Sequence, residues 1–103
     1  MLDLKRTPTH PGQILKEDFI LPLGISQTEL AKKLKTTFRT VNEILNAKRG
    51  VTPEMAIRLS RFFGTSEELW LNLQNQYDLY RVKEKKKDIL RHIKYCKEMK
   101  KAS

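Results

Sequence analysis

Cysteine and long apolar runs are nearly missing from this chain of 103 residues. The single Cys96 cannot form a disulfide within the chain, which is typical of proteins in the reducing cytoplasm. No run of about 18 apolar residues is present, so the sequence predicts no segment that spans a membrane. The opening residues lack the apolar core of a secretory signal peptide. These absences favour a cytoplasmic protein.

The residue patterns of enzymes and metal proteins are also missing. The two histidines, His10 and His92, lie far apart in the sequence, and neither forms a metal-ligand cluster with Cys96. No glycine-rich loop for a phosphate and no paired acid and base stand out. The sequence therefore indicates a protein that is not an enzyme and that needs no metal and no cofactor.

Positive charge, in contrast, is in excess, with a formal net charge of +9 and a pI near 9.9. The excess falls in two blocks, because residues 32–61 and residues 82–103 each carry a net charge of +6. The segments outside these blocks are slightly acidic. This balance favours an acidic partner, such as nucleic acid, an anionic membrane surface or an acidic protein.

Helix-capping signals recur along the chain, and no segment has a convincing strand pattern. Pro11 suits the first turn of a helix that Pro22 and Gly24 end. Ser26 with Glu29 has the spacing of a capping box at the start of a second helix. The remaining helices are predicted to start after Thr37, at Thr52–Pro53 and after Thr65 or Ser66, where Thr65 and Glu68 match a second capping box. The sequence thus predicts an all-α fold of five short helices.

The second and third predicted helices are joined by only three residues, 35–37, so they must cross at a steep angle. The small side chain of Ala31 allows the close contact that such a crossing requires. On the third helix, the apolar side chains that share one face are Val41, Ile44 and Leu45. The side chains on the outward half are Arg39, Asn42, Glu43 and Asn46.

This outward face suits the major groove of DNA, where an α-helix fits and where base edges present distinguishable donors and acceptors. Arg39 can bind guanine, Asn42 can pair with adenine and Glu43 can accept from cytosine. Contacts with the flanking phosphates require donors on both sides of the helix. The candidates are Gln27 and Thr28 at the start of the second helix, and Lys48 and Arg49 in the loop after the third.

The segment SQTELAKKLKTTFRTVNEILNAKRG resembles the helix-turn-helix of phage repressors. With HPGQILKEDFILPLG before it and GVTPEMAIRLSRFFGTSEELWLNLQNQYDLY after it, the chain is similar to the HigA antitoxin family, also called virulence-associated protein I. The likeness covers residues 9–80. It implies a homodimer that represses its own operon through a palindromic double-stranded DNA operator. It also implies a HigB-like toxin partner, a ribosome-dependent endonuclease of messenger RNA, and no membrane partner.

The family's DNA-facing positions fall on a set of residues that overlaps the candidates above. The base contacts expected from the resemblance are Thr37, Phe38, Arg39, Asn42 and Glu43. The expected phosphate contacts are Gln27, Thr28, Thr40, Lys48 and Arg49.

Three positions depart from the usual helix-turn-helix pattern. Lys35 stands where the turn usually has glycine, and a left-handed backbone there would be strained by about 1 kcal/mol. Phe38 stands where a polar residue is common, and it can contact a thymine methyl group or fold back toward the core. Glu43 brings a negative charge close to phosphates, so it either reads cytosine or pairs with a neighbour such as Arg39.

The fifth predicted helix ends the main domain, which we place at residues 1–80, followed by a basic tail at 81–103. Its large side chains, Trp70, Leu73, Tyr77 and Tyr80, are candidates for the core and for the dimer interface. The tail can extend this helix or stay disordered. Three roles are open to it, as a solvated end, as a contact with the toxin or the partner copy, or as a non-specific phosphate contact.

Two other functions fit the same residues. A repressor of the same fold could act without a toxin partner. Alternatively, the chain could be a protein-interaction module with a vestigial DNA surface.

Overall fold

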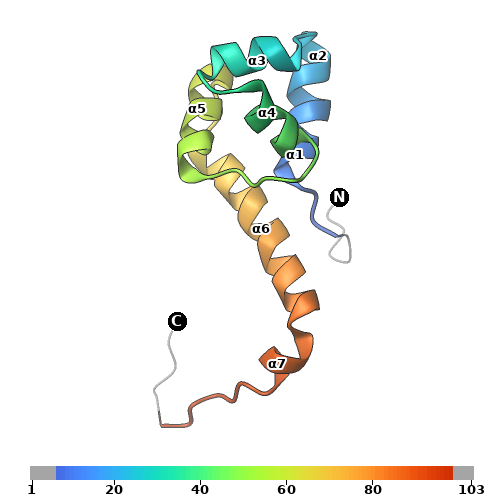
Figure 1. The fold of residues 1–103 in the computed structure, drawn as a ribbon. Helices are drawn as coiled ribbons and strands as arrows, with labels where there is room; N and C mark the ends of the chain where they lie inside the picture. Colours follow the sequence, from blue (N-terminus) through green and yellow to red (C-terminus); the bar gives the residue numbers. More distant parts are fainter. Residues whose placement is uncertain (1–6, 99–103) are drawn as a thin grey trace.

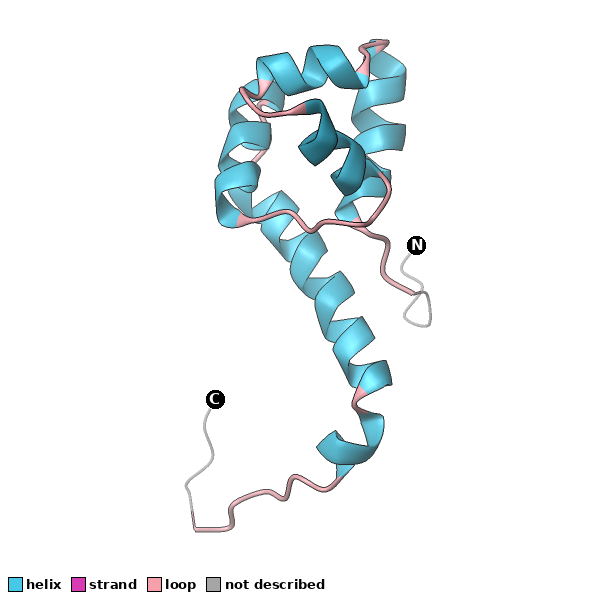
Figure 2. Cartoon of the chain, viewed as in Figure 1, coloured by secondary structure: helices cyan, strands magenta, loops and turns pink. Residues whose placement is uncertain are grey.

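The computed structural model describes residues 7–98, and every regular element in that range is helical. The elements are α1 (Pro11–Ile14), η1 (Leu15–Ile20), α2 (Leu21–Leu23), α3 (Gln27–Lys33), α4 (Phe38–Leu45), α5 (Pro53–Phe63), α6 (Glu67–Lys85) and α7 (Lys87–Arg91). The elements from α1 to α5 and the start of α6 form a rounded body, from which the rest of α6 projects as a stem (Figure 1, Figure 2). The all-α prediction is confirmed.

The first predicted helix is continuous but not regular, because α1, η1 and α2 follow one another without a break. His10 caps its start by accepting the N–H of Gly12 at Nδ1, over 2.8 Å. In the π-helical segment η1, the wider turn is closed by the N–H of Leu21 on the carbonyl of Lys16. Pro22, one residue later, cannot donate an N–H, and the π-helical turn accommodates it. The sequence predicts the helix but not this turn.

The helix-turn-helix consists of α3 and α4, as predicted. Ser26 caps α3 by accepting the N–H of Glu29 at 3.0 Å, and Thr37 caps α4 by accepting the N–H of Thr40 at 3.1 Å. Between them, Lys35 has a φ of 59°, in the left-handed region. The N–H of Thr36 reaches back to the carbonyl of Ala31 over 2.9 Å, which closes a Schellman motif with a lysine in the usual glycine position.

The last long helix, α6, begins at Glu67, and of the two predicted caps, Thr65 and Ser66, only Ser66 caps it. Ser66 is the cap, since its hydroxyl accepts the N–H of Leu69 at 3.1 Å. The predicted capping box of Thr65 and Glu68 is therefore wrong. The hydroxyl of Thr65 instead accepts the indole N–H of Trp70 at 2.7 Å, which satisfies the polar atom of the largest buried side chain.

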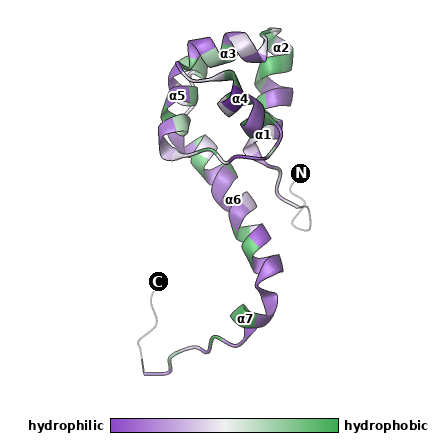
Figure 3. Ribbon diagram, viewed as in Figure 1, coloured by the Kyte–Doolittle hydropathy of each residue, from purple (hydrophilic) through white to green (hydrophobic). Residues whose placement is uncertain are grey.

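The core lies between α1, η1, α3, α4, α5 and the first turns of α6. Its largest fully buried side chains are Trp70, Leu15, Leu30, Ile44, Leu59 and Val41. Hydrophilic residues are frequent along α4 and along the stem of α6 (Figure 3). This body fixes the position of α4, because α4 contributes two of the buried side chains and the third predicted core residue, Leu45, packs against them.

A buried amide ties the loop after α4 to α6. Gln74 is only 8% exposed, and its Oε1 accepts the N–H of Val51 at 2.7 Å while its Nε2 donates to Asp78 at 3.0 Å. A Cβ atom on Gly50 would lie 3.0 Å from the Gln74 amide, so a larger residue there would force a shift. The loop and α6 are therefore closely fitted at this point.

The stem carries the helix past the predicted domain limit at residue 80. After a break at Lys86, α7 follows, and residues 92–98 have no helix. The tail is thus helical in part, and its last helix ends at Arg91. Residues 99–103 lie outside the described range.

Candidate nucleic-acid interface

The outer side of α4 is presented to solvent because the opposite side is held in the core. Val41 and Ile44 are 1% and 2% exposed, whereas the side chain of Arg39 is 83% exposed. Phe38, in the first turn, is 50% exposed and belongs neither to the core nor to its margin. The helix therefore presents the predicted face, with an aromatic ring at its leading end.

Glu43 joins two cations on this surface. Its Oε2 accepts from Arg39 Nε at 3.0 Å, and its Oε1 accepts from Arg49 Nε at 2.9 Å and Nη2 at 2.7 Å. The Arg39 guanidinium, and next the Arg49 guanidinium, lower the pKa of the Glu43 carboxyl below its ordinary value. The predicted pairing of Glu43 with Arg39 is thus present, and the contact with Arg49 was not predicted.

The path of the loop after α4 explains that second contact. Ala47 has a φ of 59°, and the N–H of Lys48 donates to the carbonyl of Glu43 at 2.8 Å, so α4 also ends in a Schellman motif. This turn folds the loop back along α4 and brings Arg49 beside Glu43. Lys48 stays exposed next to it.

An amide network connects α3 with α4. Asn42 Nδ2 donates to Gln27 Oε1 at 2.9 Å, and Asn46 Nδ2 donates to the Asn42 carbonyl at 2.9 Å. Asn42 is part-buried, and the Gln27 amide holds its side chain. Two of the residues predicted to contact DNA, Gln27 and Asn42, therefore lie side by side although they are 15 residues apart.

The hydroxyl groups at the start of α4 form a short chain. Thr37 Oγ1 accepts the Thr40 N–H as a cap and donates its own proton to Thr40 Oγ1 at 2.9 Å. The proton of the Thr40 hydroxyl therefore remains available to an outside acceptor. Thr28 is exposed in the first turn of α3, where backbone N–H groups point outward.

Arg58 of α5 supports the turn that precedes α4, and the sequence did not predict this role. Its Nη1 donates to the carbonyls of Leu34 and Lys35 at 2.8 Å and 2.7 Å, and its Nη2 contacts Glu54. The carbonyls at the end of α3 are thus satisfied by a distant side chain. No local sequence signal indicates such a contact, since the partners are more than 20 residues apart.

The predicted dimer residues differ in accessibility. Trp70 is 0% exposed within the single chain, so its indole has no surface for a second copy, and we keep the interface prediction for the other three. Leu73 and Tyr77 are part-buried, and the Tyr77 ring meets His10 edge-on with centroids 4.8 Å apart. Tyr80, further along α6, is 38% exposed.

Neither a membrane span nor a metal centre is found in the described part of the chain. Every helix within residues 7–98 is too short or too polar to span a bilayer. Residues 7–98 also hold no group of three or more metal-ligating side chains.

Comparison with known proteins identifies the architecture. A family model of the helix-turn-helix matches residues 15–70. Virulence-associated protein I of Dichelobacter nodosus is 42% identical over 80 residues, which are 78% of this chain and 74% of the relative. Antitoxin HigA-1 of Vibrio cholerae is 33% identical over 95 residues, which are 91% of this chain and 89% of the relative.

A solved structure extends the likeness to three dimensions. The Pseudomonas aeruginosa antitoxin HigA, solved with the higBA promoter, matches with a TM-score of 0.81 and 42% identity, over 84% of this chain and 96% of that one. Further relatives, from Haemophilus influenzae and Escherichia coli, are HTH-type transcriptional regulators of 38% and 40% identity, so the relatives are regulators and antitoxins, not enzymes. The chain therefore belongs to the helix-turn-helix family of DNA-binding proteins and, within it, to the HigA type of antitoxin.

Proposed function

We propose that the chain is a sequence-specific DNA-binding antitoxin that represses its own operon as a homodimer in the cytoplasm. It also neutralises a HigB-like toxin that cleaves messenger RNA. The outer face of α4 carries the DNA-binding part of the proposal, because its polar side chains project from a helix fixed in the core. The relative from Pseudomonas aeruginosa, solved with a promoter, supports double-stranded DNA as the ligand of this face.

The side chains of α4 that can contact base edges differ in how freely they move. Arg39 is exposed and can turn its guanidinium from Glu43 to the two acceptors of a guanine. Asn42 is held by Gln27, so its amide meets an adenine edge with little loss of rotamer freedom. Thr37 and Phe38 lie at the leading end of the helix, where Phe38 can contact a thymine methyl group.

Contacts with phosphates fix the position of these base-contacting side chains along the duplex. Gln27 and Thr28 lie at the N-terminus of α3, which favours an anion. Thr40 has a free hydroxyl proton, and Lys48 and Arg49 lie in the loop on the other side of α4.

A homodimer would place two copies of α4 in successive major grooves, about 34 Å apart along the duplex. We propose that Leu73, Tyr77 and Tyr80 of α6 contribute to the contact between the copies. All three residues belong to α6, and part of each side chain remains exposed.

Replacing Arg39 tests the reading role. Arg39→Ala should relax selection at one base pair in each half-site, at a cost of about 1–3 kcal/mol there, in a binding-site selection from random duplexes. Arg91→Ala, which removes the same charge from the exposed α7, is the matched control. An unaltered selected sequence and affinity for Arg39→Ala would show that Arg39 does not read the operator.

A repressor without a toxin partner is the second candidate, because every DNA-facing residue would serve it equally well. Purification of the chain from its native host, followed by identification of the bound protein and DNA, separates the two. A small toxin encoded beside the chain supports the antitoxin, and an operator fragment without any protein supports the second candidate. Failure to bind an operator fragment against competitor DNA would leave only a protein-interaction module.

A further inference from the structure

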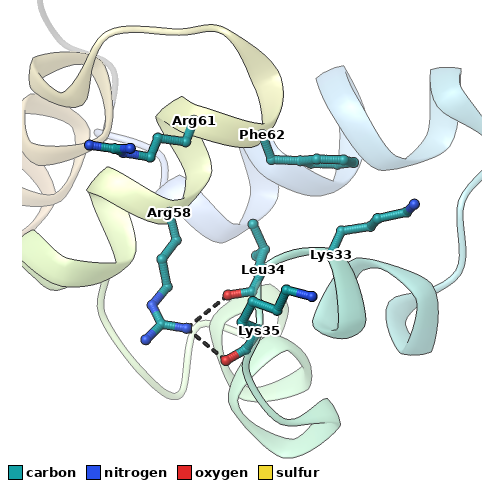
Figure 4. Close-up of a pocket in the computed structure, with 6 residues that line it drawn as sticks. All are labelled: Lys33, Leu34, Lys35, Arg58, Arg61 and Phe62. Carbon is teal, nitrogen blue, oxygen red and sulfur yellow. Dashed lines mark hydrogen bonds between the residues drawn. The ribbon is translucent and has the colours of Figure 1, made fainter.

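A shallow hollow of about 320 Å³ lies between the end of α3 and α5, beside the turn that leads into α4 (Figure 4). Four of the six residues that line it are cationic and none is acidic. The lining residues are Lys33, Leu34, Lys35, Arg58, Arg61 and Phe62. The hollow is therefore a concave surface of one sign of charge, which concentrates anions.

Three of these cations are free to bind a ligand. Arg58 is occupied by the carbonyls of Leu34 and Lys35 and by Glu54, so its role is to hold the turn. Lys33, Lys35 and Arg61 are exposed, and none of them joins an ion pair within residues 7–98. Their mutual repulsion would fall when an anion enters the hollow.

The position of the hollow relative to α4 indicates which anion it meets. Lys35 lies two residues before Thr37, the cap of α4. When a helix-turn-helix docks, the first helix crosses the DNA backbone and the start of the second reaches the base edges. The turn between the two helices then lies close to the sugar–phosphate chain. Gln27 and Thr28 serve the other end of α3, so this helix carries donors at both ends.

We propose that the hollow is a second phosphate-binding site for the duplex. Lys33, Lys35 and Arg61 bind phosphodiester oxygens that flank the bases under α4, and Phe62 and Leu34 provide an apolar floor for the deoxyribose. The inference rests on the proposed DNA-binding function and extends its footprint onto α5. An acidic segment of another protein is the competing occupant, and a salt titration on DNA distinguishes the two.

The test compares the full chain with the triple variant Lys33→Gln, Lys35→Gln and Arg61→Gln. Binding to a fluorescently labelled duplex of mixed sequence is measured by anisotropy between about 50 and 200 mM salt. Removing one phosphate-binding cation should flatten the slope of log affinity against log salt by about 0.9, and removing all three should flatten it by about 2.7. The fall in affinity across this fourfold range of salt would then shrink by up to about 40-fold.

The matched control is Lys16→Gln, which removes one positive charge from the exposed side of η1, outside the hollow and the basic tail, and which also matches the single variant Arg61→Gln. A flatter slope in the hollow variant than in this control supports the site. Equal slopes in the two variants, or a slope like that of the unmodified chain, overturn it and favour the acidic protein segment. Should the triple variant fail to fold by circular dichroism, Arg61→Gln alone gives the same decision with an expected change of about 0.9.

The same titration separates this inference from the proposed function. If the unmodified chain binds no duplex at low salt, the DNA-binding function itself fails. If it binds and the hollow variant binds alike, only the second phosphate site fails.

Discussion

The carboxylate of Glu43 engages two guanidinium groups that a duplex could otherwise use. Arg39 and Arg49 each donate to a different oxygen of this side chain, and their own side chains are 83% and 46% exposed. In Glu43→Gln, the amide keeps the length of the side chain but removes the charge that holds both arginines. We expect tighter and more salt-dependent binding to non-specific DNA, together with weaker preference for the operator.

The size of the effect follows from the two arginines. If one released arginine binds a phosphate, the slope of log affinity against log salt steepens by about 0.9. Across a fourfold change in salt, the affinity then falls about 3.5-fold further, and two released arginines give about 12-fold. Because the arginines lower the pKa of Glu43, the carboxylate is charged throughout the neutral range, and the comparison needs no special pH.

The assay is a salt titration on a duplex without an operator, followed by a binding-site selection. Glu17→Gln is the matched control, because Glu17 is exposed on η1, is bonded to Gln13 at 2.8 Å, and loses the same charge. We expect Glu43→Gln to select less strictly than the control. If its slope and selected sequence equal those of Glu17→Gln, the carboxylate does not restrain the arginines and the reasoning is refuted.

Three further outcomes are expected. Lys35→Gly should raise the free energy of unfolding by about 0.5–1 kcal/mol in urea titrations. The reason is that relief of the left-handed strain exceeds the cost of the greater conformational entropy that glycine gives to the unfolded chain. A lower free energy of unfolding would contradict this. Burial lowers the pKa of His10 from 6.5, so its neutral form contributes stability that is present above pH 6.5 and disappears as the pH falls toward the lowered value. His10→Asn, which keeps a capping acceptor, should remove that pH dependence, and an unchanged dependence would exclude His10 as its source. Lys48→Ala should weaken binding to all duplexes alike and flatten the salt slope by about 0.9, whereas weaker binding to one sequence alone would indicate base reading.

Local chemistry made most of the fold predictable from the sequence. Ser26, Thr37 and Thr52 were predicted as helix caps, and each accepts the N–H three residues ahead. Such caps are visible because both partners lie within one turn. The resemblance placed Lys35 where the turn usually has glycine, and its φ of 59° is the left-handed backbone for which strain was expected.

Interactions between distant residues could not be predicted in the same way. Arg58 reaches the turn from another helix, and Arg49 reaches Glu43 only because Ala47 turns the loop back. Thr65 matched a capping pattern, but the buried indole of Trp70 takes its hydroxyl. In each case, tertiary packing selects one hydrogen-bond partner among several that the sequence alone does not distinguish. The roles of the α4 side chains on DNA stay predictions, since geometry shows their availability and not their ligand.

Gln74 couples the loop after α4 to α6. Its amide holds the backbone of Val51, two residues past Arg49, while its own helix continues outward as the stem. A binding partner that bends or rotates α6 near Gln74 must either break this 2.7 Å hydrogen bond or move the loop together with the helix. Force applied at the distal end of α6 would in that way reach the arginine beside Glu43.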